Sequence, residues 1–123
     1  MLSTTAGESL IEFFVEGNPV PKQSFKMGKY GGYQPKRVTD WQEQVAWCAS
    51  VAYKGEPLET PVSVRLIFRR KDKRRCDLDN LAKAVNDALE GIVFKNDEQI
   101  HHLTVYKFYK QDNPGVNITV EKM

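Results

Sequence analysis

Two aspartates and a lysine stand close together in the stretch from Arg69 to Lys83, which reads RRKDKRRCDLDNLAK. Asp77 and Asp79 are two residues apart, so in an extended segment both carboxylates would face the same side. Lys83 follows Asp79 by four residues, which places it on the same side of a helix one turn later. The stretch therefore offers two carboxylates and one ammonium together, where a strand gives way to a helix.

These residue types suit the hydrolysis of a phosphodiester. Carboxylate oxygens are ligands that Mg²⁺ prefers, and a bound ion polarises the phosphodiester and lowers the pKa of a bound water. A lysine beside the ion stabilises negative charge that develops on the phosphoryl oxygens. Six of the seven residues from 69 to 75 are Lys or Arg, and such a run attracts a polyanion that the acids alone would repel.

A plainer interpretation of the same residues stays open. Asp77 or Asp79 is also a good cap for the helix that follows, because Asp is favoured at that position. Asp79 and Lys83 would then form an ordinary surface pair. One helix needs one cap, however, so capping accounts for one of the two aspartates and not for both.

A second acidic patch lies at Asn96-Asp97-Glu98. Taken alone it is a solvated turn, as its composition indicates. The predicted helix before it and a short connection nevertheless return the chain toward the sheet, so the patch can lie near the first one in space. His101 and His102 follow, and since adjacent strand residues point to opposite faces, we leave both out of the site.

Basic residues also gather between Lys22 and Arg37, in a segment with Gly28, Gly31 and Gly32. Two interpretations stand: a solvated loop, or a loop that contacts phosphates. The net charge of +2 does not by itself indicate a nucleic-acid partner, so the argument depends on clustering. The residues expected to contact nucleic-acid phosphates are Lys22, Lys26, Lys29, Lys36, Arg37, Arg69, Arg70, Lys71, Lys73, Arg74 and Arg75.

Hydrophobic periodicity predicts the elements that must position these residues. Alternating apolar residues predict strands, and apolar residues at helical spacing predict helices. The first helix is expected to begin at Thr39, because Thr39 and Gln42 have capping-box spacing. A hairpin is expected at Asp112-Asn113-Pro114-Gly115. The expected elements are strand 11–16, helix 39–52, strand 62–69, helix 80–90 with Gly91 at its end, and strands 99–109 and 116–121.

This order, β-α-β-α-β-β, predicts an α+β fold: a two-layer sandwich with two main helices on one face of a mixed sheet. At 123 residues the chain is expected to form a single domain over 1–123. Cys48 and Cys76 have no metal-site spacing, and we expect two reduced thiols. No signal peptide and no apolar run of ~20 residues is evident, so we expect a protein of the cytoplasm with no membrane partner.

The segment from Cys76 to Ala84, CDLDNLAKA, resembles the DLDNLxKA signature of RusA-type Holliday junction resolvases. The similarity continues at Asp87-Ala88-Leu89 and from Asn96 to Ile100. Val20-Pro21-Lys22 and the region of Pro35 and Trp41 match more loosely. The resemblance covers nearly the whole chain, and its specificity lies between Asp77 and Ile100.

This resemblance implies a magnesium-dependent nuclease in which Mn²⁺ can substitute for Mg²⁺ and no organic cofactor takes part. Asp77, Asp79 and Asp97 match the family's metal-holding carboxylates, and Lys83 matches its catalytic lysine. The family works as a homodimer that nicks two strands of four-way junction DNA symmetrically in recombination and repair. Its members are bacterial or encoded by phages and prophages.

Two positions depart from the family pattern: Cys76 stands where an arginine is common, and Asn96 where a second aspartate is common. Both put substrate affinity in question more than catalysis. Two other functions also remain: a junction-binding module that no longer cuts, or a nuclease acting on flaps and forks as well. Trp47 lies off the main apolar stripe of its helix, as expected for a dimer contact, although it could equally be core.

Overall fold

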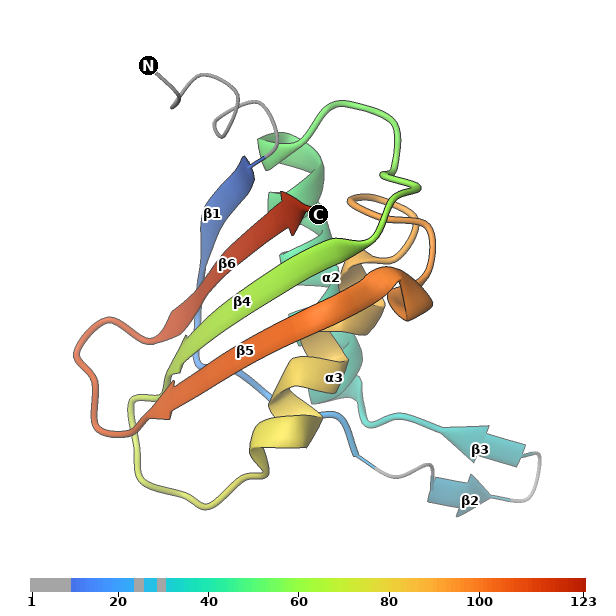
Figure 1. The fold of residues 1–123 in the computed structure, drawn as a ribbon. Helices are drawn as coiled ribbons and strands as arrows, with labels where there is room; N and C mark the ends of the chain where they lie inside the picture. The colour runs from blue at the N-terminus through green and yellow to red at the C-terminus, as the bar shows by residue number, and fades with distance from the viewer. Residues whose placement is uncertain (1–9, 24–25, 29–30) are drawn as a thin grey trace.

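The computed structural model describes residues 10–23, 26–28 and 31–123, with only the backbone for 26–28 and 31–33. Its main sheet has the strand order β1-β6-β4-β5 (Figure 1). The pairs β1·β6 and β6·β4 are antiparallel, and β4·β5 is parallel. The four strands are β1 (Leu10–Glu16), β4 (Val62–Arg69), β5 (Ile100–Phe108) and β6 (Gly115–Lys122).

Two helices, α2 (Lys36–Ala52) and α3 (Leu78–Leu89), cover one face of this sheet (Figure 1). A short 3-10 helix, η1 (Asp97–Gln99), precedes β5. The α+β prediction, with two helices against a mixed sheet, is therefore confirmed. No helix among the described residues is long and apolar enough to cross a membrane.

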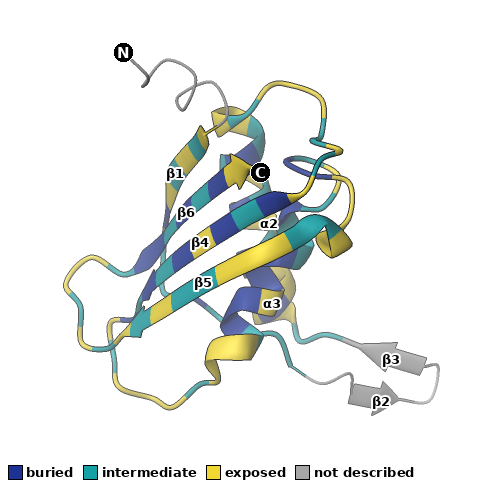
Figure 2. Ribbon diagram, viewed as in Figure 1, coloured by how far each residue is buried: buried dark blue, intermediate teal, exposed yellow. Residues whose placement is uncertain are grey.

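The core lies between the sheet and the helices, as the alternation along β4 predicts. Val62, Val64, Leu66 and Phe68 are fully buried, while the residues between them face the other way (Figure 2). They pack in one cluster with the apolar stripe of α3. Burial of each such side chain contributes about 1.5–3 kcal/mol, so this layer holds the site residues on a rigid frame.

The hairpin expected at residues 112–115 is wrong. β5 and β6 do not pair with each other, because β4 lies between them and pairs with both. Turn-forming residues reverse the direction of the chain but do not determine which strand the returning strand pairs with. Here the reversal spans a whole strand, so that Arg69 of β4 stands opposite Phe108 on one side and Gly115 on the other.

The start predicted for the first helix is also wrong, since α2 begins at Lys36 and not at Thr39. Pro35 occupies the N-cap with φ −58° and makes no side-chain capping bond. The Thr39 hydroxyl donates backwards to the carbonyl of Lys36 at 3.0 Å and so cannot cap. Starting one turn earlier places Val38 in the core, where it is fully buried.

The basic segment after β1 is not a simple loop. It forms a small antiparallel hairpin of β2 (Lys26–Gly28) and β3 (Gly31–Tyr33), which projects from the body of the molecule (Figure 1). Two hydrogen bonds close its base: Gln23 N donates to Gln34 Oε1 at 3.2 Å, and Gln34 Nε2 donates to Gln23 O at 2.7 Å. The hairpin therefore leaves the body from a fixed base.

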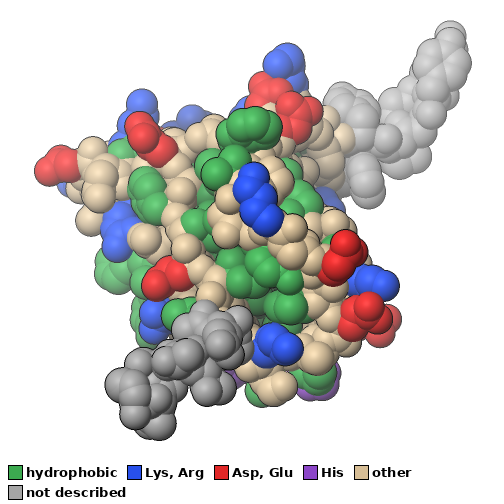
Figure 3. Space-filling view, turned by 90° about the horizontal axis from the view of Figure 1, so that it is seen from above, with side chains coloured by type: hydrophobic (Ala, Val, Ile, Leu, Met, Phe, Trp, Pro, Cys, Tyr) green, Lys and Arg blue, Asp and Glu red, His purple; other side chains and the backbone are tan. Residues whose placement is uncertain are grey.

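Charge on the visible surface is mixed. Seen from above, apolar side chains lie at the centre of the face, with both basic and acidic side chains around them (Figure 3). This face therefore presents no field of one sign to a polyanion, in keeping with the small net charge of +2. Both cysteines are free thiols, as expected, and burial raises the pKa of Cys48 above its ordinary value.

Candidate active site

The first aspartate of the signature stands at the N-cap of α3 without acting as a cap. Asp77 has an extended backbone, with φ −75° and ψ 133°, and makes no side-chain capping bond. Its Oδ2 accepts a hydrogen bond of 3.3 Å from Asn80 Nδ2, and the residue is exposed. The capping interpretation is therefore wrong for Asp77, whose carboxylate stays available to a ligand.

Asp79 lies inside the first turn of α3, so the expectation that it sits in an extended segment beside Asp77 is wrong. The positive end of the helix dipole favours a carboxylate at this position. Within the described part of the chain, neither Asp79 nor Lys83 belongs to an ion pair within 4.0 Å. The surface-pair interpretation therefore does not account for these two residues.

One face of α3 forms the wall of a hollow of about 310 Å³, which we call the α3 hollow. Asn80, Lys83 and Asp87 share this face at helical spacing, opposite the buried Leu81 and Val85. The residues that line it are Lys22, Gln23, Gln34, Asn80, Lys83, Asp87 and Asp97. Lys83 of α3 and Asp97 of the turn after it thus line the same hollow.

The turn after α3 brings Asp97 back to this site. Gly91 has a φ of +84°, a conformation that favours glycine, and its amide donates to the carbonyl of Phe94 at 2.7 Å. Phe94 is fully buried and anchors the turn in the core. Glu90 Oε2 then accepts a hydrogen bond of 2.8 Å from the amide of Asp97. The end of α3 therefore holds the backbone of Asp97 directly.

Gln99 ties the same turn to the loop before β4. Its Oε1 accepts from the amides of Lys95 and Asn96 at 3.0 and 2.8 Å. Its Nε2 donates to the carbonyls of Leu58 and Thr60 at 2.8 and 2.9 Å. These four bonds fix the turn from both sides, so the position of Asp97 is set by the fold.

Asn96 has a structural role that an aspartate at this position could also fill. It is the N-cap of η1, and its Oδ1 accepts a hydrogen bond of 2.8 Å from the amide of Glu98. Asparagine and aspartate serve equally well at an N-cap. An asparagine here therefore keeps the turn that presents Asp97.

Lys22 and Asp87 form an ion pair at the edge of the α3 hollow. The amide of Lys22 also donates to the carbonyl of Asn80 at 2.9 Å. Two bonds therefore fasten the segment before the β2–β3 hairpin to α3. Lys22 was expected only as a phosphate contact, and Asp87 was given no role, although its place four residues after Lys83 is a signal that it shares the same face.

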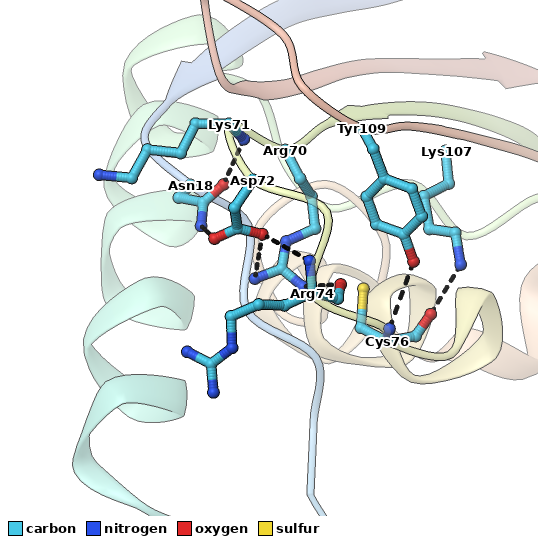
Figure 4. Close-up of polar contacts among 8 residues, drawn as sticks. All are labelled: Asn18, Arg70, Lys71, Asp72, Arg74, Cys76, Lys107 and Tyr109. Carbon is cyan, nitrogen blue, oxygen red and sulfur yellow. Dashed lines mark hydrogen bonds and ion pairs between the residues drawn. The ribbon is translucent and has the colours of Figure 1, made fainter.

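The backbone just before Asp77 is held by two residues of the β5 end of the sheet (Figure 4). Lys107 Nζ donates to the carbonyl of Cys76 at 2.7 Å. The amide of Cys76 donates to the hydroxyl of Tyr109 at 3.4 Å. These contacts use only main-chain groups of Cys76, so they do not depend on its side chain. No local sequence signal pointed to Lys107 or Tyr109.

The three predicted metal ligands are not gathered into a group. Asp97 lines the α3 hollow, Asp77 is linked to it through Asn80, and Asp79 does not line it. In the part of the chain that the structure describes, no three His, Cys, Asp or Glu side chains lie together as a metal site would need. The ligand set therefore stays a prediction.

The predicted phosphate contacts separate into distinct environments. Lys36 donates to Asp40 Oδ2 at 2.9 Å, which raises the pKa of Lys36, and Arg69 donates to Asn117. Lys71 and Lys73 are exposed. Lys29 and the side chain of Lys26 lie outside the described residues. Four arginines share a second hollow, the arginine pocket, which is lined by Asn18, Val20, Pro21, Gln23, Arg37, Arg70, Asp72, Arg74, Arg75 and Cys76.

Comparison with known proteins identifies the family of this chain. The family model described as Endodeoxyribonuclease RusA matches residues 16–121, which is most of the chain. A protein of Aquifex aeolicus (strain VF5), named Crossover junction endodeoxyribonuclease RusA, is 30% identical over 113 residues, covering 89% of this chain and 90% of that protein. A protein of Bacillus subtilis (strain 168), named Uncharacterized protein YqaN, is 28% identical over 138 residues, covering 92% and 96%.

The matched region includes α3, the turn that carries Asp97, β4, β5 and all of β6 except its last residue, and it includes only the last residue of β1. The α3 hollow therefore lies within the family's own domain. The chain belongs to the RusA family of endodeoxyribonucleases.

Proposed function

We propose that this protein is a Mg²⁺-dependent, structure-selective endodeoxyribonuclease that resolves Holliday junctions by paired symmetric nicks in DNA recombination and repair. The observation that carries the proposal is the meeting of Lys83 and Asp97 in the α3 hollow, next to Asp77 and Asn80. The name of the Aquifex aeolicus relative supports a crossover junction as the substrate. We propose that residues 1–123 form one domain that carries the whole activity. We also propose that the protein works in the cytoplasm and is encoded by a bacterium, a phage or a prophage.

Asp77, Asp79 and Asp97 are the residues that would hold the metal. All three are exposed, and none is in an ion pair within the described part of the chain. Their oxygen donors fit Mg²⁺, and Mn²⁺ fits similar ligands. When bound, the ion polarises the phosphodiester and offsets its charge.

The protein's own residues would position the DNA strand and stabilise the developing charge. Lys83 lines the α3 hollow together with Asp97, and its ammonium would donate to a phosphoryl oxygen that gains charge during cleavage. Lys22 already contacts Asp87, so its part is to hold the edge of the hollow. Glu90 and Gln99 keep Asp97 in place through the bonds to its turn.

Paired nicks require two sites, which a homodimer with two-fold symmetry supplies. Trp47 supports such an assembly. Its side chain is 70% exposed, so the alternative that Trp47 belongs to the core is wrong. Phe14 and Val51 line the same apolar hollow, and both are exposed. We propose that a second copy of the chain covers this apolar surface.

The proposal is tested with a synthetic mobile four-way junction and a linear duplex of matched sequence, each with Mg²⁺ or EDTA. Nicks on every strand are mapped on denaturing gels. We expect paired nicks on opposing strands that require Mg²⁺ and are absent from the duplex.

The other outcomes separate the competing functions. Tight junction binding without nicks would indicate a non-catalytic binding module. Equal cleavage of flaps and forks would indicate a nuclease of broader specificity. Equal binding and equal cleavage of junction and linear duplex would refute the proposed function.

A further inference from the structure

The loop between β4 and α3 builds the arginine pocket, a hollow of about 330 Å³ separate from the α3 hollow. Arg70, Arg74 and Arg75 come from this loop, and Arg37 comes from the first turn of α2. Asp72 is the one acidic residue of the lining, so the pocket has a net of three positive charges. This concentration of charge is local, since the whole chain has a net charge of only +2.

Arg70 is buried in this pocket and only weakly paired. It is 8% exposed, and its Nη2 lies 3.9 Å from Asp72 Oδ1 (Figure 4). Its Nη1 donates to the carbonyl of Arg74 at 3.5 Å, and Nε has no hydrogen-bond partner among the described residues. A guanidinium has five N–H donors, and burying it without strong partners is costly. The contacts within the chain therefore leave Arg70 short of acceptors.

Asp72 meets only part of the need of Arg70, because each of its carboxylate oxygens already accepts a hydrogen bond from another group. Its Oδ1 accepts a hydrogen bond of 3.1 Å from the amide of Arg74. Its Oδ2 accepts one of 3.5 Å from Asn18 Nδ2 (Figure 4). The carboxylate thus shapes the loop, and Arg70 keeps N–H donors that an anion from outside the chain can satisfy.

The wall of the pocket is fixed before any ligand arrives. Asn18 Oδ1 accepts from the amide of Lys71 at 2.9 Å, and the carbonyl of Asp72 accepts from the amide of Lys110 at 3.1 Å. The amide of Arg70 donates to the carbonyl of Phe108 at 2.8 Å. These bonds join the loop to the segments after β1 and β5. A preformed pocket binds without a large ordering cost.

We propose that the arginine pocket binds one non-scissile phosphate of the DNA backbone, next to the phosphodiester that is cut. Guanidinium groups match the geometry of phosphate oxygens and bind them in pairs of hydrogen bonds. The first turn of α2 adds to the positive potential, since it holds no acidic residue and no side chain caps it. The inference rests on the proposed function in taking DNA as the source of the phosphate.

The position of the pocket gives this phosphate a role in register. Gln23 lines both the arginine pocket and the α3 hollow, and Cys76 of the pocket directly precedes Asp77. A DNA strand with one phosphate bound by the arginines would therefore continue directly into the α3 hollow. Binding of this non-scissile phosphate would determine which phosphodiester lies next to Lys83 and Asp97.

The test replaces single phosphates by neutral methylphosphonates at each position around the nick and measures binding in EDTA, so that no cleavage occurs. The full-length wild type is compared with the double variant R37A/R74A, since both side chains are exposed and their loss should not disturb the fold. At one non-scissile position we expect the neutral linkage to weaken wild-type binding roughly tenfold, as for the loss of a charged hydrogen bond. In the double variant the neutral linkage should weaken binding much less at that position, because only Arg70 and Arg75 then remain to contact the phosphate.

The salt dependence of binding gives a second readout. Log K falls as log salt rises. Losing one phosphate contact in R37A/R74A should make this negative slope shallower by about one. Lys54→Ala is the matched control, because Lys54 is exposed just beyond the other end of α2, a helix of 17 residues and about 25 Å. Its slope should equal that of the wild type.

The outcomes separate the pocket from the proposed function. If every non-scissile methylphosphonate affects the wild type and R37A/R74A alike, the pocket inference is overturned even when junctions are cut. A further outcome is that the position-specific effect of the methylphosphonate is equal on linear duplex and on junction. In that case the phosphate pocket is supported and the proposed selectivity for junctions is refuted. Absence of all DNA binding would overturn both.

Discussion

The amide of Asp97 donates a hydrogen bond of 2.8 Å to the carboxylate of Glu90, the C-cap residue of α3. This contact joins the helix that carries Lys83 to the turn that carries Asp97. Both residues line the α3 hollow, so the distance between the ammonium and the carboxylate depends on that bond. Glu90 is therefore a positioning residue, and it acts through the backbone.

We expect Glu90→Ala to lower the cleavage rate about tenfold, since a hydrogen bond to a charged group contributes about 1.5–3 kcal/mol. Single-turnover rates at saturating junction measure the effect, and junction affinity should stay unchanged. Glu90→Gln keeps an acceptor oxygen and should recover most of the rate. Glu98→Ala, a change at an exposed neighbour, is the control. Equal losses in the two alanine variants would contradict the positioning role.

Asp79→Asn should abolish cleavage, with a loss on the order of 100-fold or more, and leave junction binding intact or tighter. The variant keeps the size of the side chain and removes the charge that would hold the metal, while one negative charge fewer faces the DNA. Cleavage and gel-shift assays on the same preparation measure both quantities. Glu56→Gln, an equivalent charge removal at an exposed loop residue, should cut like the wild type. Wild-type cleavage by Asp79→Asn would remove Asp79 from the metal site.

Metal binding can be followed without any reaction by adding Mn²⁺ and recording the paramagnetic broadening of amide signals. We expect the broadened signals to come from residues 77–83 and from Asp97, and Asp97→Asn to reduce the effect. EDTA should restore the signals and stop cleavage but leave Tm unchanged, because the core consists of apolar side chains. Broadening centred on any other acidic residues would move the metal site away from α3.

Gly91→Ala should lower the free energy of unfolding by about 1–2 kcal/mol, the usual cost of a left-handed backbone for a residue with a Cβ. The cause is the φ of +84° alone, since no heavy atom beyond the two neighbouring residues lies within 4 Å of the Cβ that would be added. Gly91→Asn should lose less, because asparagine tolerates this conformation better. Urea unfolding measures the series. Equal stability of the asparagine and alanine variants would show that the loss has another cause.

Trp47→Ser should weaken self-association and leave the fold intact. An indole that is 70% exposed contributes little to the core, whereas burial against a second copy would make it a main contact. Sedimentation equilibrium measures the dissociation of the dimer, and urea unfolding checks the fold. Ser50→Ala, on the same helix, is the control. A dimer of unchanged stability in Trp47→Ser would place the interface on another surface.

Much of the fold follows from local patterns. The alternation of apolar residues along β4 and the helical spacing of Leu81, Val85 and Leu89 predicted their burial correctly. The start of α2 and the pairing of β5 and β6 were predicted wrongly. A proline can begin a helix in competition with a capping pattern, and a turn leaves open which strand will be the neighbour.

The sequence alone determined which residues can do chemistry on one short segment. Asp77, Asp79 and Lys83 lie within seven residues, and the positions of such neighbours follow from local backbone geometry. The tertiary structure decided what joins them: Asp97 through Glu90, Lys22 through Asp87, and the burial of Arg70 beside Asp72. These contacts link residues that are distant along the chain or lie across a folded turn. They depend on strand order and helix packing, which no local pattern encodes.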